Sequence, residues 1–216
     1  MPQPTSIAFI TSLPLYGGGE KWMIQAATAM QDRGHRVCVV GRHQAETLRR
    51  AELAGLKVIP MWMGGWLDPL TLWRLRRVFK KEKVKVACVN LDKEIRLAGL
   101  SSWGISGFHL VPRRGSPDPI KNNWHYRFVY QNFVDRLVIN CEALVEKVCG
   151  PAPWFDREKN RIIYNGVNTE KLCRSTSKGL VREELAIPAD WTVVSLVGEV
   201  GWRKGQEILL QAAKNL

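Results

Sequence analysis

The chain reads Ile7-Ala8-Phe9-Ile10-Thr11-Ser12 near its N-terminus, then Gly17-Gly18-Gly19-Glu20, and continues with a helix-like run from Lys21 to Met30. This order of apolar strand, glycine-bearing turn and amphipathic helix presents the N–H groups of a helix N-terminus to phosphate. A second unit of the same kind spans Thr192–Leu216, around the turn Gly201-Trp202-Arg203-Lys204-Gly205. Two such units about a domain length apart predict two nucleotide-binding folds that face one another.

Short apolar runs alternate with helix-like segments along most of the sequence. The runs typical of strands cover residues 7–10, 36–40, 56–60, 84–90, 108–112, 136–140 and 161–164. Helical periodicity is present at residues 21–30, 70–79 and 93–100. Strands with helices between them predict an α/β protein with a Rossmann-like, doubly wound parallel sheet.

We expect three regions along the chain. Residues 1–168 carry the first sheet, and residues 169–189, which are polar and mixed in charge, form a linker with a short helix. Residues 190–216 carry the first strand, turn and helix of a second domain. Because one strand cannot build a stable sheet, we expect this second domain to be truncated here.

Composition indicates a globular chain with anionic partners. Its 216 residues carry a net charge of +12 and are 45% hydrophobic, so nucleic acid, anionic lipid and phosphorylated small molecules are all candidate partners. The five cysteines form no C-x-x-C pair, and buried free thiols are typical of a reducing compartment. The sequence shows no basic leader and no apolar run of about 18 residues. We therefore expect a cytoplasmic protein.

One basic segment leaves two interpretations open. Trp73–Lys85 carries seven Lys and Arg residues, and Trp62 and Trp66 precede it. A basic amphipathic helix with flanking tryptophans could rest on anionic lipid. The simpler interpretation is a solvated helix over a sheet, with the tryptophans packed beneath it, and we favour this one.

Several residues at predicted strand ends are suited to binding anions. Gly17-Gly18-Gly19 would let a ligand approach the backbone at a helix N-terminus, although the spacing fits neither a G-x-G-x-x-G fingerprint nor a P-loop. Arg113 and Arg114 follow the fifth strand, where ligands bind in open α/β sheets. Arg203-Lys204 precedes the last helix. In each case a flexible turn or a solvated pair of cations is the alternative.

Carboxylates follow the fourth strand in the same topological position. We interpret Asp92 or Asn90 as a helix N-cap, and prefer this to a catalytic carboxylate at Asp92 or Glu94. The sequence contains no D-x-D, so we expect no metal ion held by a carboxylate pair on a diphosphate. We expect no cofactor.

Four landmarks, in this order, resemble the GT-B glycosyltransferases of family 4. They are Gly17–Glu20, Arg33–Val37, Tyr164–Asn168, and Val197-Gly198 through Lys204-Gly205. The resemblance covers the whole chain, which corresponds to the N-terminal part of the family's usual length. It implies a GT-B fold whose first domain mostly binds the acceptor and whose second mostly binds the donor.

The resemblance implies a retaining, metal-independent transferase. Its donor would be a nucleotide sugar and its acceptor a glycan or glycolipid of the cell envelope. Carried over by position, Gly18 and Gly19 approach the donor diphosphate, and Arg203 and Lys204 neutralise it. Arg113 stands where many members have a histidine near the transferred sugar. Arg113 and Lys204 would then be the catalytic pair, because both stabilise charge on the leaving phosphate.

On the acceptor side the candidates are Glu20, Asp92, Glu94 and Arg114. One departure concerns Glu199, which stands where many members carry an arginine. A carboxylate there would repel a diphosphate unless Arg203 takes the arginine's part. We treat this difference as variation within the family.

Other functions remain open at this point. The alternative is a non-catalytic acceptor-binding or interaction module, and a sugar-nucleotide epimerase is a further GT-B possibility. Nucleic-acid binding has the charge but no helix-turn-helix, zinc knuckle or RNP-like strand to support it. For the transferase, we expect action at the inner face of the cell membrane, with peripheral contact to anionic lipid.

Overall fold

The computed structural model describes residues 3–170, 179–198 and 200–214. These residues divide into two compact units, Met1–Gly166 and Val167–Leu216. The domain scheme with a linker at residues 169–189 stays a prediction.

The first unit is built on one parallel sheet. The described residues form seven strands in the order β3-β2-β1-β4-β5-β6-β7. The strands are β1 (Ser6–Thr11), β2 (Arg36–Gly41), β3 (Lys57–Pro60), β4 (Val86–Val89), β5 (His109–Arg114), β6 (Leu137–Ile139) and β7 (Asn160–Ile162). This strand order is that of a doubly wound Rossmann-like sheet, so the predicted fold class is confirmed.

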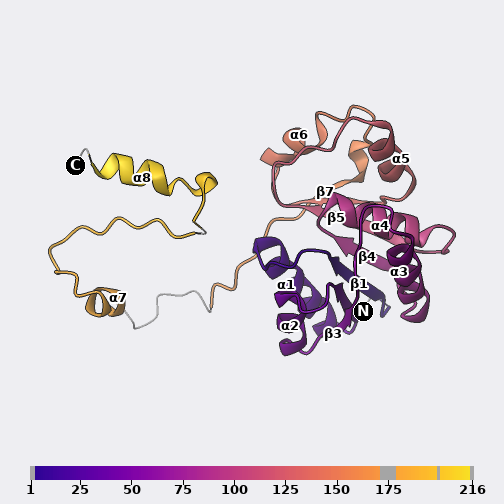
Figure 1. Cartoon of the computed structure of the whole chain (residues 1–216), viewed down its shortest axis with the longest axis horizontal. Coiled ribbons are helices and arrows are strands. Elements are labelled where there is room, and N and C mark those ends of the chain that lie inside the picture. The colour runs from indigo at the N-terminus through magenta and orange to yellow at the C-terminus, as the bar shows by residue number, and fades with distance from the viewer. Residues whose placement is uncertain (1–2, 171–178, 199, 215–216) are drawn as a thin grey trace. The chain divides into compact units, whose positions relative to one another are not determined.

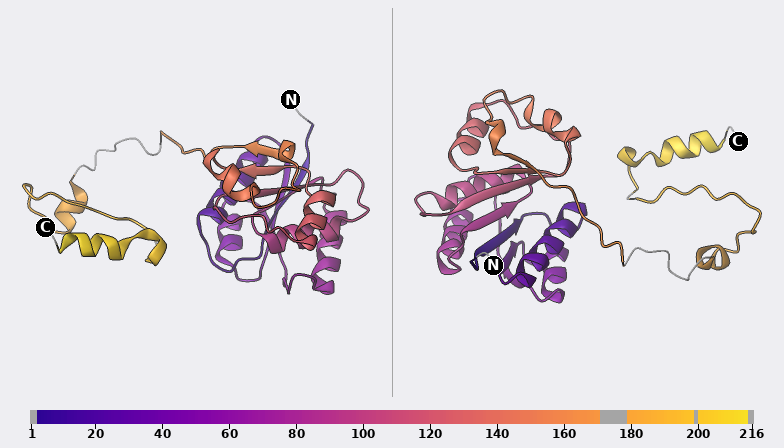
Figure 2. Two further views of the ribbon diagram at one scale, coloured as in Figure 1. Left: turned by 90° about the horizontal axis from the view of Figure 1, so that it is seen from above. Right: turned by 180° about the vertical axis from the view of Figure 1, so that it is seen from behind.

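Helices cover both faces of this sheet (Figures 1 and 2). They are α1 (Gly18–Asp32), α2 (Glu46–Leu53), α3 (Pro69–Lys81), α4 (Asp92–Ser102), α5 (Trp124–Asn132) and α6 (Ala143–Cys149). A short 3-10 turn, η1 (Arg157–Lys159), precedes β7. Helices α1 and α2 lie on one side, and α3 and α4 lie on the other.

Alternation along β1 explains why the sheet is buried on both faces. Ile7 and Phe9 pack with Met23 of α1 in one hydrophobic cluster. Ala8 and Ile10, the intervening residues, belong to the cluster on the opposite face. Successive side chains of a strand point to opposite faces, and a parallel sheet covered by helices needs apolar residues on both.

Two predictions near the fourth and fifth strands are wrong in detail. β5 ends at Arg114 instead of residue 112, and Arg113 and Arg114 pair with Val138 and Ile139 of β6. Both arginines are therefore fixed in the strand and do not lie in a loop after it. The cap of α4 is Leu91, not Asn90 or Asp92.

The second unit contains helices but no sheet among its described residues. They form α7 (Leu180–Glu184), the 3-10 turn η2 (Trp202–Lys204) and α8 (Gln206–Ala213). The strand predicted at residues 192–198 is not formed, because this unit offers it no partner strand. Val194, Val197 and Ile208 are exposed within this unit.

The cysteines that the structure describes are all free. Cys38, Cys88 and Cys149 are buried, and Cys141 is half-buried. Burial raises the pKa of Cys38 and Cys88 to about 12, so neither is a reactive thiolate. Cys173 lies outside the described residues. No helix in the described part of the chain is long and apolar enough to cross a membrane.

Candidate functional site

The strand order places a switch point between β1 and β4. From β1 the chain winds one way through β2 and β3, and from β4 the other way through β5 to β7. In open α/β sheets, ligands bind at such a point, outside the carboxyl ends of the strands. The glycine loop follows β1 there, and Asn90 follows β4.

The glycine loop opens α1 and leaves its backbone accessible. Gly17 is the N-cap, and its N–H donates to Glu20 Oε2 at 3.1 Å. Glu20 is buried and therefore closes the helix start rather than facing a ligand. A Cβ at Gly18 would meet nothing within 4 Å. At Gly19 a Cβ would lie 3.4 Å from Asn90 Nδ2, so the loop also packs against the end of β4.

Glu94 ties the ends of β1 and β4 together. Its Oε1 accepts from Ser12 N at 2.5 Å, and its Oε2 accepts from Asn90 N and Leu91 N at 3.0 Å each. The side chain is 1% exposed. Burial raises the pKa of Glu94 to about 7, although the three N–H donors favour the ionised form. Both oxygens are occupied, so the geometry gives Glu94 a positioning role.

This pKa predicts a change of stability with pH. A carboxyl group whose pKa rises on folding binds its proton more tightly in the folded state. The protonated group therefore stabilises the fold fully at pH values below the pKa that it has in the unfolded chain. The stabilisation is lost as pH rises from about 4.5 to about 7. We expect the free energy of unfolding to fall by up to about 3 kcal/mol across this range.

Denaturant unfolding at several pH values would measure this change. Glu94→Gln cannot ionise and is the matched control, so its profile should be flatter than that of the native chain between pH 4.5 and 7. Parallel profiles for the two proteins would contradict the assignment to Glu94.

Arg114 and Asp92 form a closed polar cluster. Arg114 Nη2 donates to Asp92 Oδ1 and, at 2.7 Å, to the Tyr130 hydroxyl. Tyr126 donates its hydroxyl to Asp92 Oδ2 at 2.9 Å. Burial, then the Asp92 charge, raises the pKa of Tyr126. Because Asp92 already accepts from these partners, it anchors α4 and α5 to β5.

Arg113 is placed differently, since no described carboxylate pairs with it. The residue is 6% exposed, and its Nη2 donates to Asn165 Oδ1 at 3.1 Å. Its Cζ lies 4.7 Å from the centroid of the Trp22 ring. Nε is buried without a partner. Burial lowers the pKa of Arg113, but an arginine stays charged in proteins.

A glycine makes room for this guanidinium. A Cβ on Gly115 would lie 2.5 Å from Arg113 Nη1, closer than non-bonded atoms approach. Arg113 is thus a preorganised cation at the carboxyl end of β5, held by Trp22 and Asn165. An arginine fixed in this way suits a phosphate or carboxylate.

Sequence reasoning missed the residues that hold these cations. Trp22 and Asn165 both lie within landmarks or next to them, but their contact with Arg113 joins segments far apart in sequence. Arg96 was also missed. Its Cζ lies 4.4 Å from the Trp66 ring centroid and 5.1 Å from that of Tyr126. The only sequence feature that could have indicated a role for Arg96 is its spacing of one helical turn from Asp92.

Lys204 belongs to the second unit and lies at the end of η2, next to Gly205. Its aliphatic chain passes close to Gly198, where a Cβ would lie 3.6 Å from Lys204 Cδ. Gly205 has a φ of 77°, a left-handed conformation that glycine adopts without strain. The Arg203 side chain and Glu199 lie outside the described residues, and the catalytic pairing of Arg113 with Lys204 stays a prediction.

The comparisons with known proteins bear on the same residues. The family model named Glycosyltransferase Family 4 matches residues 16–171. This chain belongs to that family. The matched region begins just before the glycine loop and ends just after the Tyr164–Asn168 landmark, so it contains Arg113 and the residues that hold it. No curated protein matches the sequence.

Solved glycosyltransferases share the fold at low sequence identity. A glycosyltransferase from Rickettsia africae superimposes with a TM-score of 0.82 at 14% identity, over 99% of this chain and 58% of its own. HepE from Anabaena, solved with UDP-glucose, gives 0.77 at 20% identity, over 97% and 57%. Sucrose-phosphate synthase from Thermosynechococcus elongatus gives 0.69 at 17%, over 98% and 60%. The chain thus spans less than two thirds of the length of these relatives, and the predicted GT-B, Rossmann-like fold is confirmed.

Proposed function

We propose that this chain is the acceptor-side part of an enzyme that transfers a glycosyl group from a nucleotide sugar. The observation that carries the proposal is Arg113, a buried guanidinium without a described carboxylate partner at the carboxyl end of β5. It belongs to the same switch-point edge as the open backbone at Gly18. A fixed cation together with a helix N-terminus is well suited to bind a diphosphate. Family membership and the UDP-glucose complex of HepE support the same substrate class.

In this proposal each residue keeps the role that the family resemblance implies. Gly18 and Gly19 accept close approach of the donor diphosphate at the N-terminus of α1. Lys204, with Arg203, neutralises the diphosphate from the second unit, and Arg113 stabilises charge on the leaving phosphate. As the family resemblance implies, the reaction would retain anomeric configuration. It would need no metal, because fixed cations stabilise the leaving group.

On the acceptor side we assign positioning roles. Glu20 and Glu94 hold the glycine loop and the ends of β1 and β4, and Asp92 and Arg114 hold α4 against β5. None of the four has to contact the acceptor to matter, since they fix the surface that the acceptor meets. We propose a glycan or glycolipid of the cell envelope as acceptor, reached at the inner face of the membrane.

Nucleotide-sugar specificity is the direct test. A protein in which this chain is joined to a complete donor domain would be incubated with UDP- and GDP-sugars and a membrane lipid extract. Release of the nucleoside diphosphate and a mass increase of one lipid-linked species are expected for one donor. Binding of extract components without nucleotide release from any donor would support the non-catalytic module instead. Conversion of the donor in the absence of extract would indicate an epimerase.

A further inference from the structure

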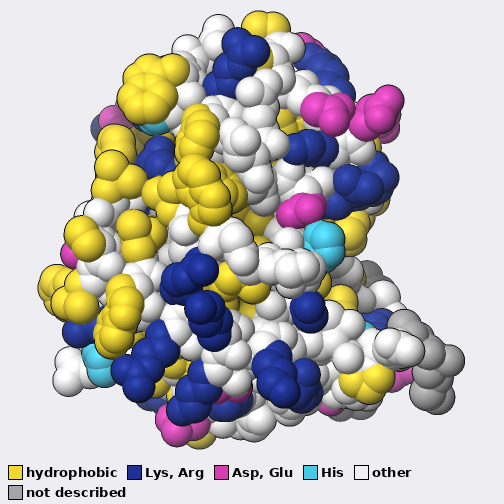
Figure 3. All heavy atoms as spheres, turned by 90° about the vertical axis from the view of Figure 1, so that its right-hand side faces the viewer, with side chains coloured by type: hydrophobic (Ala, Val, Ile, Leu, Met, Phe, Trp, Pro, Cys, Tyr) yellow, Lys and Arg dark blue, Asp and Glu magenta, His cyan; other side chains and the backbone are white. Residues whose placement is uncertain are grey.

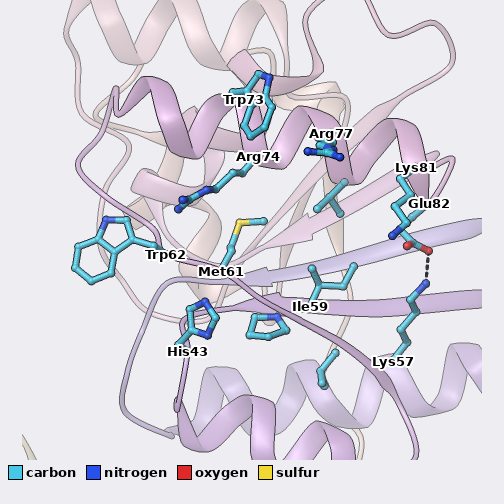
Figure 4. A pocket seen from close by; sticks show the side chains of 13 residues that line it. His43, Lys57, Ile59, Met61, Trp62, Trp73, Arg74, Arg77, Lys81 and Glu82 are labelled. Atoms are coloured by element: carbon cyan, nitrogen blue, oxygen red, sulfur yellow. Dashed lines mark hydrogen bonds and ion pairs between the residues drawn. The ribbon is translucent and has the colours of Figure 1, made fainter.

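A groove runs between the edge strand β3 and helix α3, and no residue of the glycine loop lines it. Its volume is about 720 Å³. Val58, Ile59 and Met61 line it from the strand side, and Arg74, Arg77 and Lys81 line it from the helix (Figure 4). The groove therefore has an apolar floor and a cationic wall.

No described carboxylate lies within ion-pair distance of the cations on this wall, although Asp68 has an electrostatic interaction with Arg74. Glu82 is the carboxylate among the groove residues, and it already pairs with Lys57 at 2.6 Å. None of Arg74, Arg77 and Lys81 forms an ion pair with a described carboxylate. Three unpaired cations beside an apolar floor match an amphiphilic anion, with phosphate on the wall and hydrocarbon on the floor.

Trp62 and Trp73 line the groove, and the segment between them exposes further large apolar side chains. Trp62, Trp66 and Trp73 are 59%, 58% and 57% exposed. Leu67 and Leu70 are also exposed. The predicted packing of the tryptophans beneath the helix is therefore wrong, whereas the predicted placement of the helix over the sheet is confirmed. Thr71, Leu75 and Phe79 fill the inner face of α3 instead.

The outer face of α3 carries apolar residues near its N-terminus and basic residues near its C-terminus. The outer face of α3 is not purely polar, because Leu70 and Trp73 occupy its first turns and Lys80 and Lys81 its last. The side of the molecule on which α3 lies shows Lys and Arg side chains gathered beside hydrophobic ones (Figure 3). Tryptophan and basic residues together are typical of a surface that lies in the headgroup region of a bilayer.

We propose that this face, made of the β3–α3 groove and the exposed tryptophans of residues 62–73, docks on an anionic phospholipid bilayer. Lipid phosphates contact Arg74, Arg77 and Lys81, and the indoles of Trp62, Trp66 and Trp73 enter the interface. The inference does not depend on transferase activity, since it rests on this surface alone.

Docking would also orient the candidate site. Trp62 follows β3 at its carboxyl end, and His43, another groove residue, follows β2 at the same end. The glycine loop follows β1 at this same edge of the sheet. A bilayer that covers the groove would therefore border the edge at which a lipid-linked acceptor has to arrive.

Vesicle co-sedimentation of this 216-residue chain tests the proposal. Vesicles of phosphatidylcholine alone and with 30% phosphatidylglycerol would be compared at low and at 0.5 M salt. We expect binding to the anionic vesicles, weakened by salt, and little binding to the neutral ones. Arg74→Gln/Arg77→Gln/Lys81→Gln should lower the partition constant about 100-fold, since each surface cation contributes about 1 kcal/mol.

The matched control removes the same charge elsewhere. Arg33→Gln/Arg127→Gln/Lys147→Gln changes three exposed cations outside the groove and should bind vesicles nearly as well as the native chain. Circular dichroism confirms that both triple variants fold. An equal loss in both would mean that net charge alone drives binding, and would overturn the proposal.

Two further readouts separate the bilayer from other anions. Brominated lipids should quench tryptophan fluorescence, and Trp62→Phe/Trp66→Phe/Trp73→Phe should remove most of this quenching. A mobility shift with mixed-sequence DNA and RNA provides the second readout. Absence of vesicle binding, or quenching that the triple Trp variant retains, would overturn the proposal. The proposal would also be overturned if the chain bound nucleic acid through Arg74, Arg77 and Lys81 but did not bind vesicles.

Discussion

Arg113→Ala is expected to lower kcat for glycosyl transfer by about 100-fold in the complete enzyme. Removal of one preorganised group that stabilises developing charge typically costs 10²–10³ in rate. Arg113 fits this role because its guanidinium is fixed by Trp22 and Asn165 and has no described carboxylate partner. Steady-state kinetics with the donor that the nucleotide-release assay selects would measure the loss, and KM for the donor should change less than kcat.

Three companion variants make this result interpretable. Arg113→Lys keeps the charge but loses the hydrogen bond from Nη2 to Asn165 Oδ1, so an intermediate rate is expected. Gly115→Ala keeps the arginine at position 113 but puts a Cβ 2.5 Å from its Nη1. The variant should lower kcat because the guanidinium has to move away from this Cβ. Arg127→Ala removes an exposed arginine of α5 and should leave the rate unchanged. Native kcat in both Arg113 variants would exclude electrostatic catalysis by this residue.

The fold was predictable because strands that are buried on both faces of a sheet appear in the sequence as short, continuous apolar runs. Ile7–Ile10 and Arg36–Val40 are short, apolar and bounded by turns, and each became a strand within one residue of the prediction. The predicted strand at residues 192–198 had the same local pattern but failed. A strand forms only where a partner supplies the ladder, and no local pattern reports whether one is present.

The candidate site was less predictable, because its contacts join distant segments. The sequence identified Glu94 and Asp92 as carboxylates after the fourth strand but not their partners. Glu94 accepts from Ser12, which is 82 residues away, and Arg113 donates to Asn165, which is 52 residues away. Such pairs depend on strand order and register, which follow from packing of the whole sheet. The spacing of motifs therefore predicted the positions of the loops at the candidate site, but it did not predict which partners their side chains contact.

Glu94→Ala should destabilise the first unit by about 3 to 5 kcal/mol. The substitution leaves the N–H groups of Ser12, Asn90 and Leu91 buried without an acceptor, and each such donor costs about 1–3 kcal/mol. The cavity left by the side chain admits at most partial compensation by water. Equilibrium unfolding in urea, followed by tryptophan fluorescence, would give the free energy of unfolding.

A surface glutamate provides the matched control for this prediction. Glu146 pairs with Arg157 at 2.7 Å, but both side chains are exposed. Glu146→Ala should therefore cost less than about 1 kcal/mol. If Glu94→Ala were no more destabilising than Glu146→Ala, the link between β1 and β4 would not depend on this carboxylate. A large difference would instead mean that the switch point itself is held by one buried side chain. Glu94 would then matter to catalysis through the geometry of the glycine loop, without contact with the substrate.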